Sequence, residues 1–211
     1  MKYLPKAFVL IFLITVFNAL AKDSVSRSEP ALQAGIDYKI INPAWPTGSK
    51  KTVIYEFFSY MCPGCNAFEP HMEQLSDQTS EQHEIIRVPV SFYPQWEPHA
   101  KAYYALKMMG ELDKVHKSLF AAIHQFKKPL RTLEDIGDWL FASFSIDKQA
   151  FLSTAESFAV DNEIRKANKM VKTLGIGGVP RLVVDGRYLP DFKQLKTADN
   201  IIEATLYLAN K

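Results

Sequence analysis

Cysteine is scarce in this chain, because only two of its 211 residues are cysteines. The sequence therefore holds no framework of structural disulfides. A structural zinc site normally needs four nitrogen or sulfur ligands, and the five histidines form no H-x-x-x-H pair that could complete one. Hydrophobic residues make up 47% of the chain, which is sufficient for a core that needs no disulfide to hold it together.

The chain also lacks a large net charge, because its 25 lysines and arginines are nearly balanced by 23 aspartates and glutamates. A chain so close to neutral has no electrostatic basis for binding nucleic acid or for binding strongly to a membrane surface. The sequence also contains no internal repeat and no long low-complexity tract. We therefore expect one domain, or one domain with an insertion.

The N-terminus carries an apolar run that is short for a membrane anchor. Lys2 and Lys6 precede apolar-rich residues 7–20, and the run closes with an A-x-A sequence at Ala21. About 20 apolar residues are needed to span a bilayer as a helix. A basic start, a short apolar stretch and an A-x-A end predict a secretory signal peptide over residues 1–21, which implies export.

The two cysteines stand three apart as Cys62-Pro63-Gly64-Cys65, at the predicted junction of a strand and a helix. Residues 52–59 are β-branched and aromatic, and apolar residues recur at helical spacing after the motif. A thiol at a helix N-terminus faces unpaired N–H groups that favour the thiolate, and the second thiol can close a small disulfide ring. The pattern favours redox chemistry. Half of a tetrahedral metal site and a structural clip are the alternatives, although so short a ring removes little chain entropy.

The predicted elements form an α/β frame that is interrupted by helices. Strands are predicted at residues 38–41, 52–59, 84–90, 181–184 and 187–189, and the helices of the frame at 63–80 and 197–210. The central part of the chain is predicted to be helical at residues 98–109, 112–126, 132–144, 147–155 and 158–174. We therefore expect a flexible N-terminal segment at 22–34, a frame at 35–92 and 175–211, and an inserted helical subdomain at 93–174.

Two local signals support these boundaries. Thr132, followed three residues later by Asp135, is typical of a helix N-cap close to a capping box. Asp185-Gly186 stands between two strand-like segments and predicts a tight hairpin turn.

The order β-α-β, then ββα, with C-x-x-C at the first helix and Val-Pro before the hairpin, resembles a thioredoxin fold with a helical insertion. Residues 56–65, EFFSYMCPGC, followed by FEP at 68–70, are similar to the active-site segment of DsbA-type periplasmic disulfide oxidoreductases. GVP at 178–180 is similar to the cis-proline loop of that family, and residues 184–188 resemble its terminal hairpin. The resemblance runs from about residue 38 to the C-terminus.

The resemblance implies a role for each residue of this site. Cys62 would be the exposed sulfur that a substrate thiolate attacks, and Cys65 would be its disulfide partner. Pro180 would follow a cis peptide bond that places the Val179 backbone beside the disulfide, where it can bind an extended substrate. Pro63 and Gly64 would contribute to substrate binding from between the cysteines.

Glu56 is a further candidate catalytic residue. It lies within the predicted strand 52–59, and a central parallel strand is normally apolar on both faces. A buried acid there is costly unless it is hydrogen-bonded or protonated, so it could hold a proton for Cys65, as the resemblance implies. A solvated position on the strand is the alternative.

The chain departs from the common family pattern at two positions. Gly64 stands where the family usually has histidine, so a ring that could stabilise the thiolate is missing and we expect a less oxidising enzyme. Asn42 stands where some members carry a second buried acid.

Together these features predict a soluble periplasmic enzyme that donates its Cys62–Cys65 disulfide to newly exported proteins, without a bound cofactor or metal. The resemblance implies reduced exported proteins as substrates and a DsbB-type, quinone-linked membrane protein as the reoxidase. We expect a monomer that binds no nucleic acid. The alternatives are a disulfide reductase or isomerase of the same fold, and a dithiol metallochaperone or binding protein.

Other conspicuous side chains are interpreted as structural. Tyr103, Tyr104, Met108 and Met109 recur at helical spacing and are predicted in the core of the insertion. The aromatic segment at 92–96 could line an apolar groove near the active site or simply pack. The histidines are interpreted as surface residues or as satisfied polar residues.

Overall fold

The computed structural model describes residues 32–211, which form one compact unit. The predicted signal peptide at 1–21, and most of the predicted flexible segment at 22–34, lie outside the described residues. Within residues 32–211, no helix is both long enough and apolar enough to cross a membrane.

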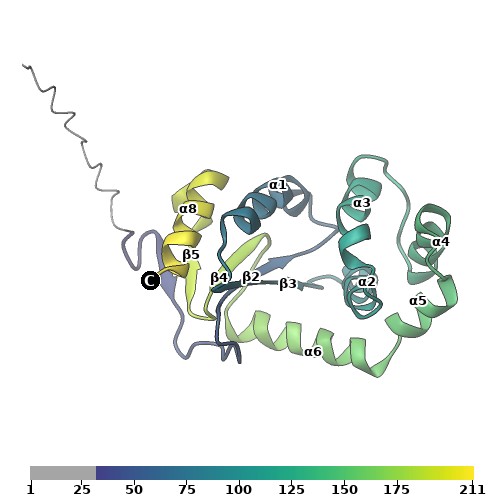
Figure 1. Ribbon diagram of the computed structural model, residues 1–211, viewed down its shortest axis with the longest axis horizontal. Helices are drawn as coiled ribbons and strands as arrows, with labels where there is room; N and C mark the ends of the chain where they lie inside the picture. The colour runs from purple at the N-terminus through teal and green to yellow at the C-terminus, as the bar shows by residue number, and fades with distance from the viewer. Residues whose placement is uncertain (1–31) are drawn as a thin grey trace, which may run out of the picture. The chain divides into compact units, whose positions relative to one another are not determined.

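A five-stranded sheet in the order β1-β5-β4-β2-β3 forms the frame (Figure 1). Its strands are β1 (Tyr38–Ile40), β2 (Thr52–Phe58), β3 (His83–Pro89), β4 (Arg181–Val184) and β5 (Tyr188–Pro190). The predicted β-α-β unit is confirmed, because β2 and β3 are parallel and α1 (Pro63–Gln78) connects them. β4 pairs antiparallel with β2, and β1 pairs antiparallel with β5 as an edge strand.

The helical insertion follows β3 and ends before β4, as predicted. Its helices are α2 (Glu97–Met108), α3 (Leu112–His124), α4 (Leu133–Phe144), α5 (Lys148–Ala155) and α6 (Phe158–Thr173). Figure 1 shows α1 and α8 (Ala198–Ala209) on one side of the sheet and α6 on the other, with α2 to α5 beyond β3. The core continues from the sheet into the insertion, because apolar side chains of β2 and of α2 to α6 belong to one buried cluster.

Local sequence signals account for several boundaries. Thr132 and Asp135 form the predicted capping box at the start of α4. Asp185 and Gly186 adopt positive φ values of 51° and 61° in the predicted hairpin turn. A Cβ atom at Gly186 would lie 2.2 Å from the carbonyl oxygen of Trp45, so glycine is required there.

The sequence did not predict a 3₁₀ turn at Pro94–Trp96 or the short helix α7 (Phe192–Leu195). Each is too short to show a helical period of apolar residues.

Two interpretations from the sequence need correction. Tyr103 and Tyr104 are buried as predicted, but Met108 is 46% exposed because it follows the buried stripe of α2 at the end of the helix. His116 is buried, but both of its ring nitrogens are hydrogen-bonded, so it is a satisfied polar residue as expected. His99 is neither a surface residue nor satisfied, because it is 1% exposed and neither of its ring nitrogens has a hydrogen-bond partner.

Candidate active site

The cysteine pair lies where β2 passes into α1. Cys62 is the N-cap residue of α1 and is partly exposed, whereas Cys65, one turn into the helix, is 1% exposed. Both are free thiols, so the structure represents the dithiol form. The backbone amides of Cys65 and Asn66 both bond to the Cys62 carbonyl oxygen at 3.1 Å, which closes the first turn over the motif.

The Val179–Pro180 loop lies beside Cys62. β4 begins directly after Pro180 and pairs with β2, and this pairing brings together two segments that are far apart in the sequence. The Val179–Pro180 peptide bond is cis, and Cys62 Sγ lies 3.5 Å from the Val179 carbonyl oxygen, to which the protonated thiol can donate. Gly64 is exposed at the same place, and a Cβ atom added there would lie 3.4 Å from Pro180 Cδ and 3.6 Å from Cys62 Sγ.

The two sulfurs differ strongly in acidity. The hydrogen bond from the Cys65 thiol lowers the pKa of Cys62 to about 6 against the opposing effect of burial, and the Cys65 and Gly64 amides add to the shift. The same sulfur–sulfur hydrogen bond, together with burial, holds the pKa of Cys65 well above its usual range. Cys62 is therefore the thiolate of the reduced pair, and Cys65 keeps its proton.

Glu56 is buried in β2 with 1% exposure, so the solvated alternative is wrong. Burial raises the pKa of its carboxyl to about 7, while the positive charge of Arg87 acts in the opposite direction. The charge of Glu56 in turn contributes to the raised pKa of Cys65. Glu56 therefore exchanges its proton in the neutral range, within electrostatic reach of the buried thiol.

Arg87 of β3 joins Glu56 to a second buried acid, Glu69 of α1. Its guanidinium donates to both carboxylate oxygens of Glu69, at 2.7 and 2.8 Å, and Nη1 lies 3.1 Å from Glu56 Oε2. Burial alone would raise the pKa of Glu69, but its contacts with His116 and Arg87 lower it. Glu69 is thus a second buried acid of this region, whereas Asn42 is exposed.

His116 of α3 extends this network toward the active-site segment. Arg87 Nη1 lies 2.7 Å from His116 Nε2, and because a guanidinium only donates, Nε2 must be the acceptor. The proton of the neutral ring is then on Nδ1, 2.6 Å from the Tyr60 hydroxyl oxygen. Burial lowers the pKa of His116, which keeps the ring neutral.

Sequence reasoning missed Arg87, Glu69 and His116 as a group. Glu69 lies in the quoted FEP segment, but no local signal indicates that it meets an arginine from β3 and a histidine from α3.

Known proteins resemble this chain in both sequence and structure. The sequence model of the thioredoxin family matches residues 47–204. The thiol:disulfide interchange protein DsbA of Pseudomonas aeruginosa is 35% identical over 84% of this chain and 88% of its own length. The DsbA of Azotobacter vinelandii is 34% identical over 92% of this chain and 91% of its own. This chain belongs to the DsbA family of the thioredoxin superfamily.

The fold agrees with this assignment. The crystal structure of P. aeruginosa DsbA superposes with a TM-score of 0.79 at 33% identity, over 85% of this chain and 93% of the other. As a DsbA-type protein, this chain is a protein thiol:disulfide oxidoreductase with a thioredoxin fold and a helical insertion.

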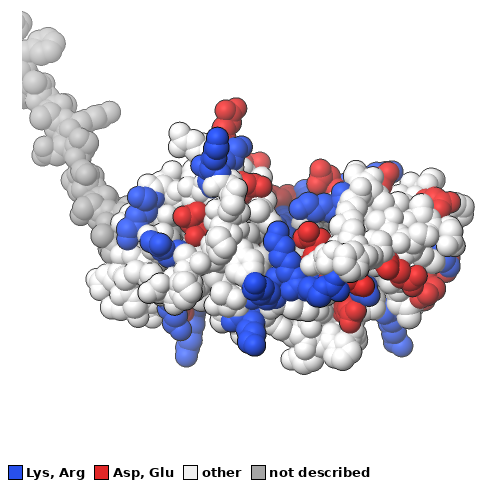
Figure 2. All heavy atoms as spheres, turned by 90° about the horizontal axis from the view of Figure 1, so that it is seen from below, with Lys and Arg blue, Asp and Glu red and all other residues white. Residues whose placement is uncertain are grey.

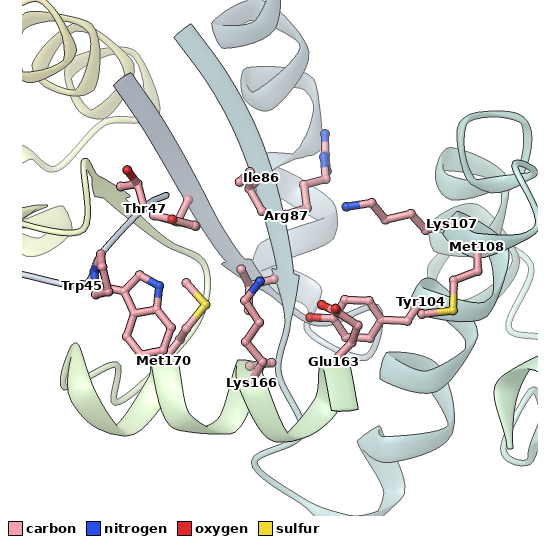
Figure 3. Close-up of a pocket in the computed structure, with 14 residues that line it drawn as sticks. Trp45, Thr47, Ile86, Arg87, Tyr104, Lys107, Met108, Glu163, Lys166 and Met170 are labelled. Atoms are coloured by element: carbon pink, nitrogen blue, oxygen red, sulfur yellow. The ribbon is translucent and has the colours of Figure 1, made fainter. Parts of the chain in front are cut away.

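A pocket of about 510 Å³ lies apart from the cysteines of this DsbA-type protein. Figure 3 shows Lys166 of α6, Lys107 of α2 and Trp45 at its walls, with Tyr104 and Glu163 side by side at one end. Figure 2, which views the molecule from below, shows lysine and arginine side chains gathered near the middle of that face, with acidic side chains beside them. Neither cysteine lines the pocket.

No group of three or more histidine, cysteine, aspartate and glutamate side chains within residues 32–211 is arranged to hold a metal ion. In the aromatic segment at 92–96, Phe92 and Tyr93 pack against Trp96, while both remain partly exposed. A contribution of this segment to binding stays a prediction.

Proposed function

We propose that this DsbA-type protein oxidises newly exported proteins in the periplasm, with Cys62 as the attacked sulfur. The observation that carries this assignment is that Cys62 is partly exposed beside the Val179 carbonyl while Cys65 is 1% exposed, and the lower pKa of Cys62 agrees with it. Stabilising the Cys62 thiolate stabilises the reduced enzyme, which favours transfer of the disulfide to the substrate.

The exchange takes two steps. In the disulfide form, a substrate thiolate attacks Cys62 Sγ, a mixed disulfide forms, and the electron pair of the broken bond goes to Cys65. A second substrate thiolate then attacks the substrate sulfur of the mixed disulfide and releases Cys62 as a thiolate. The substrate gains one disulfide and the enzyme becomes a dithiol, so the electrons balance.

Cys65 must take up a proton when it leaves, because its pKa lies far above neutral. Glu56, with a pKa of about 7 and within electrostatic reach of Cys65, is the buried group that supplies this proton and is protonated again before the next cycle. The Val179 carbonyl and the exposed Pro63–Gly64 turn offer the substrate backbone a place to bind beside Cys62.

Export and reoxidation complete the proposal. The signal peptide at 1–21 supports a periplasmic location, and the family relationship supports a DsbB-type membrane protein as reoxidase. N-terminal sequencing of the protein from a periplasmic fraction is expected to begin at Lys22. An uncleaved N-terminus would contradict this.

The direct test measures oxidation of a reduced peptide with two cysteines by the disulfide form. One disulfide is expected per enzyme, and Cys62→Ala and Cys65→Ala are each expected to abolish transfer. Given the peptide in its disulfide form instead, Cys65→Ala is expected to accumulate a mixed disulfide at Cys62, because no second enzyme thiol can resolve it. A reduction potential near the thioredoxin value of about −270 mV would contradict donation and favour a reductase.

A further inference from the structure

Gly64 occupies the position of the motif where the family usually has histidine. A histidine from another helix, however, contacts the turn that precedes the motif. His124 is the last residue of α3, and its Nε2 lies 2.8 Å from the carbonyl oxygen of Tyr60. Tyr60 lies inside the tight turn that leads to the motif, since the Cys62 amide donates to the Ser59 carbonyl oxygen at 3.0 Å. The imidazole of His124 therefore contacts the backbone two residues before Cys62.

The contact defines which ring nitrogen is the donor. A carbonyl oxygen only accepts hydrogen bonds, so Nε2 of His124 carries the hydrogen in this contact. Phe120 stacks on the ring with centroids 6.2 Å apart, and it packs on Tyr60 at 4.8 Å. The ring is thus held in one orientation relative to the active-site turn.

The charges around this contact complement one another. Cys62 caps the N-terminus of α1, where helix amides favour an anion, and His124 ends α3, where exposed carbonyls interact favourably with a cation. The charge of His124 is among the causes that lower the pKa of Cys62. Within residues 32–211, the two histidine–carboxylate pairs involve His71 and His116, so no carboxylate there competes for His124. The nearest charged residues that follow it in the chain, Lys127 and Lys128, are exposed.

We propose that His124 is the positioning residue that supplies the cation for the Cys62 thiolate, a role that Gly64 leaves open within the motif. This rests on the proposed function in that the reduced enzyme is the product of disulfide donation. The imidazole holds the turn through the Tyr60 carbonyl, and the charge of the ring stabilises the Cys62 thiolate and therefore the dithiol form.

The test separates the charge of His124 from its hydrogen bond. His124→Gln keeps an N–H donor for the Tyr60 carbonyl but cannot become a cation, whereas His124→Ala removes both. His71→Gln is the matched control, because His71 lies on α1, the helix that Cys62 caps, but its ring pairs with Asp199 on α8. Thiolate absorbance across pH measures the pKa of Cys62, and equilibration with glutathione measures the redox equilibrium.

We expect His124→Gln and His124→Ala each to raise the pKa of Cys62 and to shift the glutathione equilibrium toward the disulfide form of the enzyme by about fivefold. His71→Gln is expected to match the wild type. A wild-type pKa and equilibrium for His124→Gln would overturn the proposal, since the ring would then only hold the turn. An equal shift in His71→Gln would also overturn it. Peptide oxidation by the wild type tests the proposed function separately.

Discussion

Arg87 and Glu56 form an ion pair that includes no hydrogen bond. Arg87 Nη1 lies 3.1 Å from Glu56 Oε2, but neither oxygen of Glu56 has a hydrogen-bond partner. The two N–H groups of Nη1 are directed to Glu69 Oε2 and to His116 Nε2, each at 2.7 Å. Glu56 therefore has a nearby positive charge that offsets only part of the cost of burial, and its pKa rises to about 7.

We predict that Glu56→Gln stabilises the fold at pH 8 and has little effect at pH 4. The carboxyl has a pKa of about 7 when folded and 4.5 as a reference, so the folded state holds the proton more tightly. This contribution to stability is complete below pH 4.5 and is lost as the pH rises to 7. The difference allows a gain of up to about 3 kcal/mol at pH 8, which urea unfolding at the two pH values would measure.

An equal gain in the free energy of unfolding at pH 4 and pH 8 would contradict this account, because the effect would then come from packing and not from the charge of Glu56. In the same variant, the proposed proton transfer to Cys65 predicts slower formation of the mixed disulfide, because Cys65 leaves in that step, and rapid quenching with acid measures it.

We predict that Arg87→Met destabilises the fold by about 3 kcal/mol, because it leaves two buried carboxyls without their counter-charge. Arg187→Met, on an exposed residue of the hairpin turn, is the control and is expected to be near neutral. Adding Glu69→Leu to Arg87→Met should recover part of the loss. Urea unfolding measures all three, and a loss below about 1 kcal/mol for Arg87→Met would show that the pair contributes little.

We predict that His99→Leu stabilises the protein, and more at pH 5 than at pH 8. Burial lowers the pKa of His99 below 6.5, so protonation favours the unfolded chain. The wild type keeps its full stability above pH 6.5 and loses it as the pH falls below that value. The additional gain at pH 5 is up to about 2 kcal/mol. Thermal unfolding at both pH values tests this, and a gain that does not change with pH would contradict it.

We predict that Gly64→His raises the reduction potential and lowers the pKa of Cys62 further. The added Cβ meets Pro180 Cδ at 3.4 Å, which is ordinary contact, and Gly64 is exposed, so the backbone can carry a side chain here. Gly64→Ala is the control for the added bulk without the ring. Equilibration with glutathione measures the effect, and an unchanged potential in Gly64→His would refute the expectation that glycine makes this enzyme less oxidising.

The sequence predicted the frame because its signals are local. The alternation and β-branching of residues 52–59, the helical spacing after Cys62 and the Asp185-Gly186 turn each depend on neighbours in the chain. Element boundaries were accordingly within two residues for most strands and helices, and the short helix α7 was missed.

By itself, the sequence determined that the chain carries a dithiol at the start of a helix in an α/β frame with a helical insertion. Only the tertiary structure decided which partners surround that dithiol. Arg87, Glu69 and His116 come from β3, α1 and α3, and His124 meets Tyr60 from the far end of α3. These contacts depend on how α3 packs against α1 and the sheet, and no periodicity within a single segment encodes that packing.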